Sequence, residues 1–425
     1  MIGLRRAAEL CEFCPKMCRF ACPASEVSSR EAWTPWGKVS LAALSGRAPD
    51  ASAALAFGAC SGCLRCQTYC AHANDVPAVL YAARASAIRA GSAPASWADV
   101  ARRMSGVGHA EAVDILAVYR DIAAADNRAA GRASNAASSP DPASATHSAA
   151  TRTRSSGSSS GASRSVSSAL RSVAGSVTSL LRPAADAAPL RPLLFAGCDA
   201  LAAGGRPVRE ALAVARALSA PLTLAPESAL CCGLKLVESG HPEMFAAHSA
   251  RVRTSLVGSA RRPPGIHLVL LSPGCVRAVR ERWPALPDGS RVEHVTTYLS
   301  RALAARADLR ERPPLPEAVT YHDPCELARG LSELTAPRAL LAGAVAELRE
   351  PTRTGIDTSC CGANGLMPRT LPAVASAMAG DRRAELEACG APAVTANPAC
   401  SNVLGASDVV SVLARWLGID VEKAA

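Results

Sequence analysis

The sequence predicts an α+β protein, in which a small helical domain rich in cysteine is joined by a disordered linker to a duplicated α/β cysteine-rich domain. Three observations predict this class. Most of the 17 cysteines of the 425-residue chain fall into tight groups, a low-complexity stretch divides the chain, and strand and helix signals alternate after that stretch. We expect four segments, at residues 1–122, 123–189, 190–310 and 311–425.

The sequence also indicates a cellular compartment. The chain runs from Met1 to Cys11 without the apolar stretch of a secretory signal, and the longest apolar runs, near Leu193 and Leu268, are broken by Gly or Pro. We therefore expect a cytoplasmic protein without a transmembrane segment, while peripheral attachment at the inner face of the membrane stays open. In a reducing compartment the thiols are metal ligands or reactive groups rather than disulphides.

The formal charge of +10 does not indicate a nucleic-acid partner. Many arginines lie in low-complexity sequence, and no basic stretch is interleaved with aromatic residues. That sequence, residues 123–189, is dominated by Ala, Ser, Gly and Arg, so it has too little apolar surface to offset its ordering entropy. It predicts a flexible linker, with a weak helical pattern from Leu170 to Leu181.

Beyond the linker, strand and helix signals alternate, as in an α/β domain. Strands are predicted at residues 192–197, 222–224 and 266–271, and helices at 208–218, 276–283 and 297–304. The cysteines of this region repeat in order: a single cysteine, a vicinal pair followed by Gly, and a cysteine shortly after Pro. The first copy is Cys198, Cys231, Cys232 and Cys275, and the second is Cys325, Cys360, Cys361 and Cys400. The shared order indicates a gene duplication.

The N-terminal cysteines form two groups whose spacing is typical of iron–sulphur ligands. The first is Cys11-x-x-Cys14-x-x-x-Cys18-x-x-x-Cys22-Pro23, and the second is Cys60-x-x-Cys63-x-x-Cys66-x-x-x-Cys70. A cubane cluster needs four thiolates around a compact core, so three close cysteines wrap one side and a remote fourth closes the site. A pair of zinc sites is the alternative, although zinc usually takes two separated pairs of cysteines.

These groups resemble those of bacterial two-cluster ferredoxins, in which the fourth cysteine of each cluster belongs to the other motif. By that resemblance, one [4Fe-4S] cluster is held by Cys11, Cys14, Cys18 and Cys70, and the other by Cys60, Cys63, Cys66 and Cys22. Two departures affect the first cluster. One extra residue precedes Cys18, and Ala71 replaces the Pro expected after the last cysteine.

A vicinal cysteine pair followed by Gly is suited to a multi-iron cluster. Two adjacent cysteines do not comfortably reach one metal ion, but they reach different atoms of a cluster. Gly233 and Gly362 are expected to let the backbone approach closely. Cys198 and Cys325 lie where a strand gives way to a helix, and backbone N–H groups at a helix start favour a thiolate.

The order Cys…Cys-Cys-Gly…Pro-x-Cys, present twice, resembles the cysteine-rich domains of heterodisulphide reductase subunits and of the iron–sulphur subunits of glycolate and lactate oxidases. Residues 321–325 (Tyr-His-Asp-Pro-Cys) and 359–365 (Ser-Cys-Cys-Gly-Ala-Asn-Gly) carry the resemblance most closely. It implies an electron-transfer subunit. That subunit would take electrons from a flavin-dependent 2-hydroxy-acid dehydrogenase and pass them through [4Fe-4S] clusters to a quinone or similar membrane-bound acceptor. It also implies one further iron–sulphur cluster in each module.

One departure from that family bears on the chemistry. Disulphide-cleaving members end each module in Cys-x-x-Cys, whereas Ser272 and Asn397 stand where this chain would need the first cysteine. The departure favours the members of the family that carry electrons for a dehydrogenase over those that cleave disulphides. Three alternatives stay open: a heterodisulphide or thiol reductase with its chemistry at the vicinal pairs, a zinc-stabilised scaffold without redox chemistry, and a module without a cluster.

The remaining candidate residues have structural interpretations. Cys389 fits neither copy and is expected to be a buried small residue at a helix end. His322 and Asp323 are expected to cap the turn before Cys325, since no paired acid–base partner is visible. Trp36 is expected to cover the core of the small domain. No catalytic residue is assigned, and the lack of a glycine-rich nucleotide loop places flavin or nicotinamide on another subunit.

Overall fold

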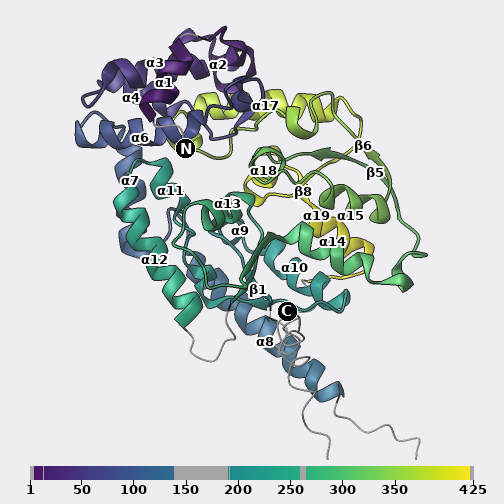
Figure 1. The fold of residues 1–425 in the computed structure, drawn as a ribbon. Helices are drawn as coiled ribbons and strands as arrows, with labels where there is room; N and C mark the ends of the chain where they lie inside the picture. The colour runs from purple at the N-terminus through teal and green to yellow at the C-terminus, as the bar shows by residue number, and fades with distance from the viewer. Residues whose placement is uncertain (1–3, 13, 138–189, 191, 259–264, 422–425) are drawn as a thin grey trace, which may run out of the picture. The chain divides into compact units, whose positions relative to one another are not determined.

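The computed structural model describes residues 4–12, 14–137, 190, 192–258 and 265–421 (Figure 1). They fall in two compact units, residues 1–126 with 190–425, and residues 127–189. Of the second unit only residues 127–137 are described, as the end of helix α8 (Ile115–Ala137). The helical pattern expected from Leu170 to Leu181 lies outside the described residues. The first unit contains all the cysteines and both sheets.

The N-terminal part of the first unit, residues 4–126, is helical and is called the head below. Its helices are α1 (Leu4–Glu12), α2 (Pro23–Ser28), α3 (Pro35–Ser45), α4 (Ala51–Gly58), α5 (Arg65–Thr68), α6 (Val76–Arg89), α7 (Ala95–Val107) and the first part of α8, with 3₁₀ turns at Met17–Ala21 and Glu31–Trp33. Their buried faces meet around Phe57, Leu80 and Trp97.

Local sequence determines where the head helices begin. Thr34 caps α3, since its hydroxyl accepts a hydrogen bond from Gly37 N at 3.2 Å, and Pro35 follows at the first helical position. Asp50 caps α4 by accepting from Ala53 N at 2.7 Å, and Asp75 caps α6 by accepting from Ala78 N at 3.0 Å. Short capped helices of this kind position the segments between them, and the second cysteine group, from Cys60 to Cys70, lies between α4 and α6.

The first module contains a four-stranded parallel sheet with the strand order β2-β1-β3-β4. The strands are β1 (Pro192–Phe195), β2 (Thr223–Leu224), β3 (His267–Leu270) and β4 (Arg291–His294). The helices are α9 (Cys198–Ala202), α10 (Arg206–Ala217), α11 (Leu234–Glu238), α12 (Pro242–Gly258), α13 (Pro273–Glu281) and α14 (Val295–Ala304), with 3₁₀ turns at Pro226–Ala229 and Ala307–Leu309. These elements agree with the strands and helices expected from the sequence.

The second module repeats this arrangement with the strand order β6-β5-β7-β8, again all parallel. The strands are β5 (Leu315–His322), β6 (Val345–Arg349), β7 (Ala393–Thr395) and β8 (Ser407–Asp408). A π-helical turn at Glu326–Gly330 and a 3₁₀ turn at Gly355–Asp357 accompany α15 (Ala336–Ala344), α16 (Met367–Thr370), α17 (Pro372–Glu387), α18 (Pro398–Leu404) and α19 (Val409–Trp416). The repeated order of strands confirms the duplication, and the mixture of helices with parallel sheets confirms the α+β class.

The strand order determines where the cysteines of each module meet. In both sheets the chain adds its second strand on one side of the first and its third strand on the other, so the chain direction switches between the first and third strands. Ligands of parallel α/β sheets bind beside the carboxyl ends of the strands at such a switch point. Cys198 follows β1 and Cys275 follows β3, and Cys325 and Cys400 occupy the same places in the second module.

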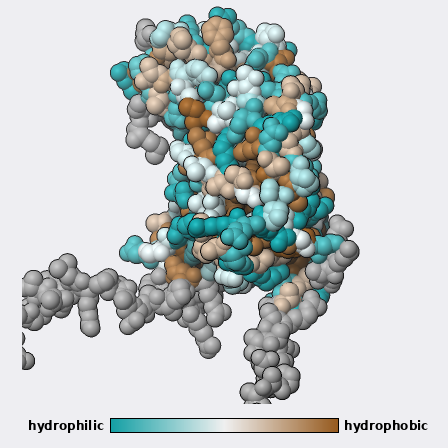
Figure 2. Space-filling view, turned by 90° about the vertical axis from the view of Figure 1, so that its right-hand side faces the viewer, coloured by the Kyte–Doolittle hydropathy of each residue, from teal (hydrophilic) through white to brown (hydrophobic). Residues whose placement is uncertain are grey.

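The described part of the chain differs from the expectations in one boundary. Helix α8 continues from Ile115 through residue 122, where the linker was expected to start, to Ala137. This stretch is rich in alanine, which has the highest helix propensity of all residues. No described helix is long and apolar enough to cross a membrane. Hydrophilic residues interrupt the apolar ones on the face that Figure 2 shows.

Two contacts centred on arginines hold the head against the modules. Arg84 is fully buried and donates to Phe57 O and Cys60 O within the head and, at 2.7 Å, to Glu238 O of the first module. Arg329 of the second module donates to Cys63 O of the head at 2.7 Å. Both arginines therefore bond the backbone of one head loop, residues 60–66, which contains three cysteines.

Candidate metal centres

All 17 cysteines lie within the described residues, and none of them forms a disulphide there. Sixteen belong to the four groups expected from the sequence. Cys389 stands apart, directly after α17, where its thiol donates to Glu385 O at 3.7 Å. It is half-buried rather than buried, because the helix end on which it sits faces the surface. Among the described residues, no hydrogen bond joins Cys389 to another cysteine.

The first head set (Cys11, Cys14, Cys18 and Cys70) gathers around Asn74. The amide Nδ2 of Asn74 donates to Cys11 Sγ at 3.0 Å, and its backbone N donates to Cys70 Sγ at 3.5 Å. Burial, and the thiols of Cys14 and Cys70, raise the pKa of Cys11 to about 11. Burial with the neighbouring thiols raises the pKa of Cys18 to about 11 in the same way. The remote Cys70 therefore lies beside the cysteines of the first group.

The second head set (Cys22, Cys60, Cys63 and Cys66) lines one pocket together with Lys38. Lys38 is 1% exposed, and its Nζ donates to Cys22 Sγ at 3.4 Å and to Ala59 O. Burial raises the pKa of Cys60, while the charges of Lys38 and Arg84 oppose that effect. Burial also raises the pKa of Cys66 well above its usual range, with Cys63 and Cys60 adding to it.

The groups around the second head set fit a thiolate-ligated iron–sulphur cluster. A buried charge is costly unless a counter-charge lies close to it. Lys38 and Arg84 are two cations with almost no exposed surface, and both act on the thiol of Cys60. A cluster held by four thiolates carries net negative charge and would balance these cations. The neutral thiols alone would supply no such charge.

The first-module set (Cys198, Cys231, Cys232 and Cys275) is almost completely buried. Cys198 begins α9, Cys275 lies in the first turn of α13, and the vicinal pair precedes α11. Cys198 Sγ lies 3.6 Å from Cys231 Sγ. The contact with Cys231, followed by burial, raises the pKa of Cys198 well above its usual range. The set is therefore a closed cluster of thiols at the switch point of the first sheet.

The second-module set (Cys325, Cys360, Cys361 and Cys400) has the same arrangement. Cys325 Sγ lies 3.8 Å from Cys360 Sγ, and Cys361 Sγ lies 3.5 Å from Cys400 Sγ. Asn397 caps α18 through its Oδ1 and donates from Nδ2 to Cys400 Sγ at 3.5 Å. Asn397 replaces the expected first cysteine of a Cys-x-x-Cys motif, so the structure gives that position a contact with sulphur.

The glycines after the vicinal pairs have the backbone conformation that the sequence led us to expect. Gly233 and Gly362 have φ angles of +88° and +77°, which residues with a Cβ rarely adopt. Their N–H groups donate to Cys231 Sγ and to Cys360 Sγ, both at 3.4 Å. A Cβ on Gly362 would lie 3.1 Å from Ala375 O. The glycines therefore fold the loop tightly around the first sulphur of each pair.

His322 is a residue of this site that the sequence interpretation placed in a structural role. Its ring lies with Cys361 and Cys400 in one buried group, whose ligand atoms are all within 4.8 Å of one another. Contact with the Cys400 thiol, and then the His322 imidazole, lower the pKa of Cys361 well below its usual range, although burial opposes this. Burial lowers the pKa of His322 itself, so the ring is neutral. The histidine therefore contacts the sulphurs instead of capping a turn.

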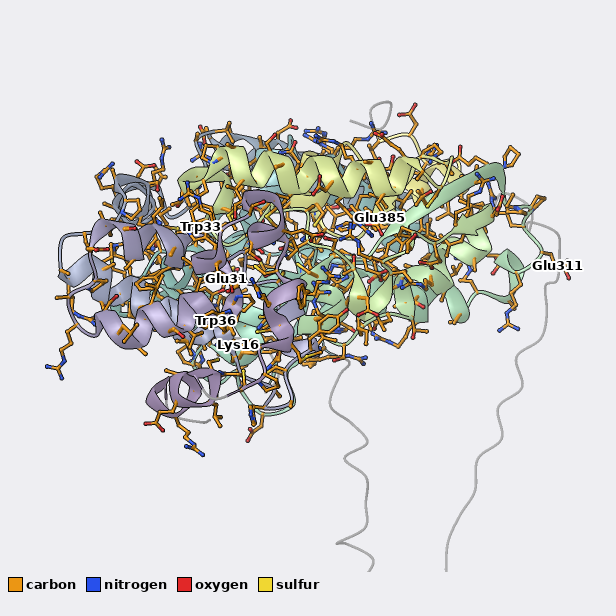
Figure 3. All side chains as sticks on the ribbon, turned by 90° about the horizontal axis from the view of Figure 1, so that it is seen from above. Lys16, Glu31, Trp33, Trp36, Glu311 and Glu385 are labelled. Carbon is orange, nitrogen blue, oxygen red and sulfur yellow. The ribbon has the colours of Figure 1, made fainter. Side chains whose placement is uncertain are left out.

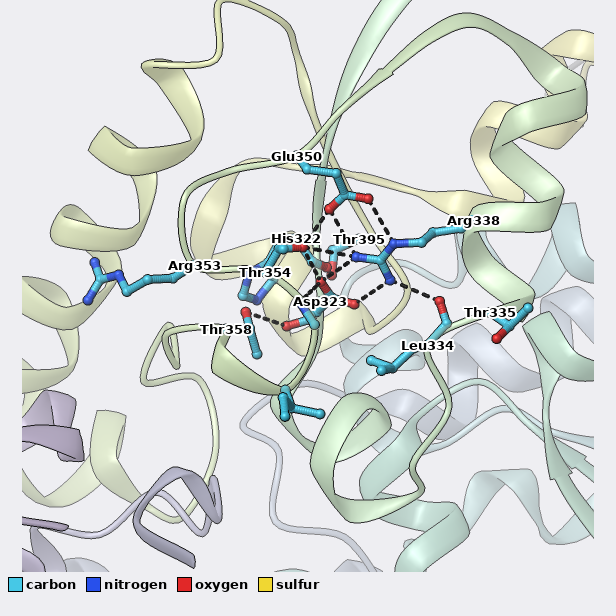
Figure 4. A network of polar contacts seen from close by, with 12 residues as sticks. His322, Asp323, Leu334, Thr335, Arg338, Glu350, Arg353, Thr354, Thr358 and Thr395 are labelled. Atoms are coloured by element: carbon cyan, nitrogen blue, oxygen red, sulfur yellow. Dashed lines mark hydrogen bonds and ion pairs between the residues drawn. The ribbon is translucent and has the colours of Figure 1, made fainter. Parts of the chain in front are cut away.

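Asp323 has the structural role expected of it. Its carboxylate accepts hydrogen bonds from both terminal nitrogens of Arg338, at 2.8 and 2.7 Å, and from Gly355 N at 2.8 Å (Figure 4). Burial raises the pKa of the carboxyl, but these bonds, led by Arg338, hold the pKa of Asp323 below its usual value. The network joins β5 to the loop after β6 and keeps Cys325 in place.

Trp36 lies on the head surface in contact with charged groups. Its Nε1 donates to Glu31 Oε1 at 3.0 Å, and Lys16 Nζ lies 4.1 Å from the centre of a ring (Figure 3). The indole is half-buried. Trp33, which is 6% exposed, is the tryptophan that covers the core.

The second head set adjoins the second-module set, a contact that the sequence interpretation missed. Ser61 Oγ lies 3.3 Å from Cys360 Sγ. The contact with the Cys360 thiol is the largest cause that raises the pKa of Cys63 well above its usual range. Cys22 and Cys63 also pack against the buried cluster that contains Cys325 and Cys360. No motif in the sequence predicts this contact, because the residues lie about three hundred positions apart and meet only through tertiary packing.

A cavity of about 250 Å³ lies between the two modules and is lined by charged groups from both and from the head. Lys235 and Asp199 come from the first module, Arg369 from the second and Glu111 from the head. Asp199 follows Cys198 directly, and Glu111, Cys198 and Asp199 form a second group of ligand atoms within 4.8 Å of one another. The first-module cysteines therefore have a polar opening beside them.

Comparison with known proteins identifies the duplicated region. The family model of the CCG cysteine-rich domain matches residues 193–279 and 319–405. The dihydromethanophenazine:CoB--CoM heterodisulfide reductase of Methanosarcina barkeri has a subunit that is 29% identical over 247 residues, which cover 53% of this chain and 58% of that protein. The fumarate reductase (CoM/CoB) of Methanothermobacter marburgensis has one that is 28% identical over 162 residues, which cover 38% of this chain and 30% of that protein.

A third relative is similar over a shorter stretch. The EtfAB:quinone oxidoreductase of Syntrophomonas wolfei is 30% identical over 98 residues, which cover 23% of this chain and 14% of that protein. This chain therefore spans less than two thirds of the length of each of these relatives. The similarity therefore covers only part of each of these proteins.

Proposed function

We propose that this chain, which belongs to a heterodisulphide-reductase-related family and carries two CCG cysteine-rich domains, is an iron–sulphur electron-transfer subunit of an oxidoreductase. The first head set would hold one cluster and the second head set another. Both are proposed to be [4Fe-4S] clusters, and each module set would hold a further iron–sulphur cluster. The clusters supply one-electron carriers, and the chain holds their thiolates, buries them and sets the charges around them.

The observation that carries this proposal is the continuity of the cysteine sets. Cys18 of the first head set lies close enough to Cys66 of the second to raise its pKa. Cys63 of the second head set contacts Cys360 of the second module. Three sets therefore lie in succession. An arrangement of this kind favours electron transfer through the chain over separate structural metal sites.

The donor and acceptor belong to the same proposal. A flavin-dependent 2-hydroxy-acid dehydrogenase of the glycolate or lactate type would deliver electrons, and a quinone or similar carrier would accept them. Two observations support this branch: Ser272 and Asn397 replace the cysteines of disulphide-cleaving relatives, and one relative is named as a quinone oxidoreductase. The flavin would sit on the partner subunit. Peripheral binding at the inner face of the membrane would follow from the acceptor.

A thiol or heterodisulphide reductase is the second candidate. The charged cavity between the modules favours it, because it opens beside Cys198 and offers both cations and carboxylates to a polar substrate. Incubation of the dithionite-reduced protein with an anionic heterodisulphide separates the two candidates. Release of free thiol with oxidation of the clusters would support reduction of a disulphide, whereas unchanged thiol would support electron transfer alone.

Anaerobic purification with assays of iron, zinc and acid-labile sulphide tests the proposal. We expect iron and sulphide in at least the amount of two [4Fe-4S] clusters per chain, and interacting cubane signals in the electron paramagnetic resonance spectrum after reduction. A matched pair of variants identifies the source of the signals: Cys66→Ser should remove one cubane signal, and Cys389→Ser should leave all of them. A colourless protein that contains zinc alone would contradict the proposal.

A further inference from the structure

The two modules place different side chains at one equivalent position beside the cysteines. The last residue of β1 is Phe195, three residues before Cys198, and the last residue of β5 is His322, three residues before Cys325. Phe195 and His322 are both 1% exposed. A buried aromatic hydrocarbon in one copy therefore corresponds to a buried imidazole in the other.

A second buried position differs in the same sense. Counted from the proline that begins each helix, Val252 occupies in α12 the place that Arg382 occupies in α17. Both residues have no exposed surface. Burying an arginine is costly, and in Arg382 the donors of Nε and NH1 find partners among the described residues while NH2 finds none. The second module therefore carries a pair of polar residues, His322 and Arg382, where the first carries an apolar pair.

Arg382 fixes the tautomer of His322. Its Nε donates to His322 Nδ1 at 2.9 Å, and a guanidinium has donors only, so Nδ1 must accept and the ring proton must sit on Nε2. Arg382 is itself held, since its NH1 donates to Glu385 Oε2 at 2.8 Å and to Arg353 O at 3.0 Å. The N–H of the imidazole therefore points away from Arg382.

The Nε2–H group of His322 is aimed at sulphur. Nε2 has no nitrogen or oxygen partner among the described residues, and one nitrogen of the ring lies within 4.8 Å of the sulphurs of Cys361 and Cys400. Because Nδ1 is taken by Arg382, Nε2 is the nitrogen left to face them. A buried donor without a partner costs about 1–3 kcal/mol, which a nearby thiolate acceptor would recover. Asn397 Nδ2 adds a second side-chain donor, at 3.5 Å from Cys400 Sγ.

We propose that His322 is a positioning residue that donates its Nε2–H to the cysteine sulphurs of the second-module cluster, and so makes that cluster easier to reduce than the cluster of the first module. The inference rests on the proposed function. Hydrogen bonds to ligand sulphur withdraw negative charge and stabilise the reduced state, so they raise the reduction potential. In the first module, the described side chains include no such donor at Phe195 or Val252.

Donation to sulphur is favoured over direct binding of iron by His322. Binding through Nε2 would require that nitrogen to give up its proton, while Nδ1 still faces the Arg382 donor. The ring would then be an anion. A ligand histidine usually has the opposite arrangement, in which the nitrogen not bound to metal donates to a carboxylate or a carbonyl. The geometry at His322 therefore suits a donor.

The inference makes the second module the preferred destination of electrons. That module also contacts the second head set through Ser61 and Cys63. The cluster that receives electrons from the head is thus the one that holds them more tightly. The first-module cluster, beside the charged cavity, would be reduced at lower potential.

The test compares midpoint potentials of the intact, cluster-containing protein, measured by redox titration with electron paramagnetic resonance. His322→Phe copies the residue of the first module, so it keeps the buried volume and removes the donor. We expect the second-module cluster to shift to lower potential and the first-module cluster to stay unchanged. Arg382→Met no longer holds the imidazole of His322 in one tautomer, so it should shift the potential of the second-module cluster in the same direction. His248→Gln is the control, because His248 Nε2 contacts the backbone oxygen of Cys231 at 2.7 Å rather than a sulphur.

Three results would overturn the inference. An unchanged potential in His322→Phe would show that the imidazole does not act on the cluster. Loss of the second-module iron in both His322→Phe and His322→Gln, together with strong nitrogen coupling in the spin-echo spectrum of the wild-type protein, would show that His322 is a ligand. A wild-type protein without iron in the second module would overturn the proposed function as well, and iron and sulphide analysis of that protein distinguishes this case from the other two.

Discussion

The two modules have the same strand order and the same cysteine positions, yet they differ in the groups packed around the sulphurs. Before Cys275, Ser272 starts α13 without a side-chain cap, whereas before Cys400, Asn397 caps α18 and donates to sulphur. Phe195 in one module corresponds to His322 in the other. The duplication has therefore kept the ligand positions and changed the neighbours that determine a potential.

The modules also differ in how they meet the head. Both modules contact the head through hydrogen bonds: Arg84 donates to Glu238 O of the first module, and Arg329 of the second module donates to Cys63 O. The second module also contacts the head through sulphur, at Cys360. Both copies thus attach the head, the first through the fully buried Arg84, and the second is in addition placed to exchange electrons with it under the proposed function.

The largest expected effect follows from the sulphur contact. Cys360→Ser removes the second-module ligand that adjoins the head, so reduction of the second-module cluster by electrons entering at the head should be almost abolished. Cys231→Ser makes the same change in the first module and should leave that reduction close to the wild-type rate. Rapid freeze-quench electron paramagnetic resonance after mixing with reductant measures both. Equal rates of reduction in the two variants would show that the two modules do not differ in how they receive electrons from the head.

The arginines that attach the head should differ in their contributions to stability. Arg84→Met leaves the buried carbonyls of Phe57, Cys60 and Glu238 without donors, and we expect a loss of about 3–5 kcal/mol in the free energy of unfolding. Arg329→Met affects a part-exposed side chain, so a smaller loss of about 1–2 kcal/mol is expected.

Urea unfolding of the two arginine variants under anaerobic conditions, followed by circular dichroism, measures this difference. The measured iron content of each variant controls for loss of a cluster. A larger loss for Arg329→Met than for Arg84→Met would contradict the view that the fully buried Arg84 is the stronger attachment.

The head approaches the second module closely at Gly365, so a substitution there should cause a smaller loss of stability. A Cβ on Gly365 would lie 2.4 Å from Ser61 Cα, and the φ angle of +72° already disfavours a side chain. Gly365→Ala should therefore cost about 2–4 kcal/mol from the combined clash and backbone strain. Gly405 has a φ angle of +66° but open space around it, so Gly405→Ala should cost only about 1 kcal/mol.

Thermal unfolding of the two glycine variants separates the clash from the strain. The cysteine sets of the head and the second module meet at Ser61, so Gly365→Ala should also slow reduction of the second-module cluster, and Gly405→Ala should not. Equal destabilisation by the two variants would show that the head and the second module do not pack as closely as the structure places them.

The sequence predicted the duplication and most element positions because short apolar runs broken by Gly and Pro mark buried strands of parallel sheets. It did not predict the contact of Ser61 with Cys360, since nothing local links residues so far apart. Arg84 was missed for another reason. Arginine is mostly a surface residue, and only the tertiary structure shows the carbonyls that hold it.

The candidate site was predicted less completely than the fold. The resemblance to two-cluster ferredoxins led us to expect Cys70 near Cys11, and the structure places both around Asn74. That the four sets hold clusters stays a prediction. The role of His322 depended on Arg382, which lies sixty positions away and turns the ring proton toward sulphur. In the linker region, alanine-rich sequence was interpreted as disordered from residue 123, although alanine favours the helix that continues to Ala137.

The two modules also differ in the residue that caps their final helix. His294 caps α14 by accepting from Thr296 N at 3.3 Å, and Asp408 caps α19 by accepting from Val410 N at 2.9 Å. Burial acts on the two in opposite directions. It lowers the pKa of His294 to about 4 and raises the pKa of Asp408 to about 7. Both caps are thus favoured in their neutral forms.

These shifts predict opposite dependences of stability on pH. The contribution of His294 is present above its unfolded pKa of about 6.5 and is lost as pH falls toward 4, whereas that of Asp408 is present below about 3.9 and is lost as pH rises through 7. Between pH 7 and pH 5 each changes the free energy of unfolding by about 2 kcal/mol, and the two changes largely cancel in the wild-type protein.

Replacing either cap by asparagine, which also caps helices well, should reveal the other. His294→Asn should make the protein more stable at pH 5 than at pH 7, by about 2 kcal/mol relative to wild type, and Asp408→Asn should make it less stable by a similar amount. Urea unfolding at the two pH values measures this, and other titrating groups cancel in the difference between the variants. Parallel profiles for the two variants would show that the caps titrate alike, so that burial does not separate the two modules at this position.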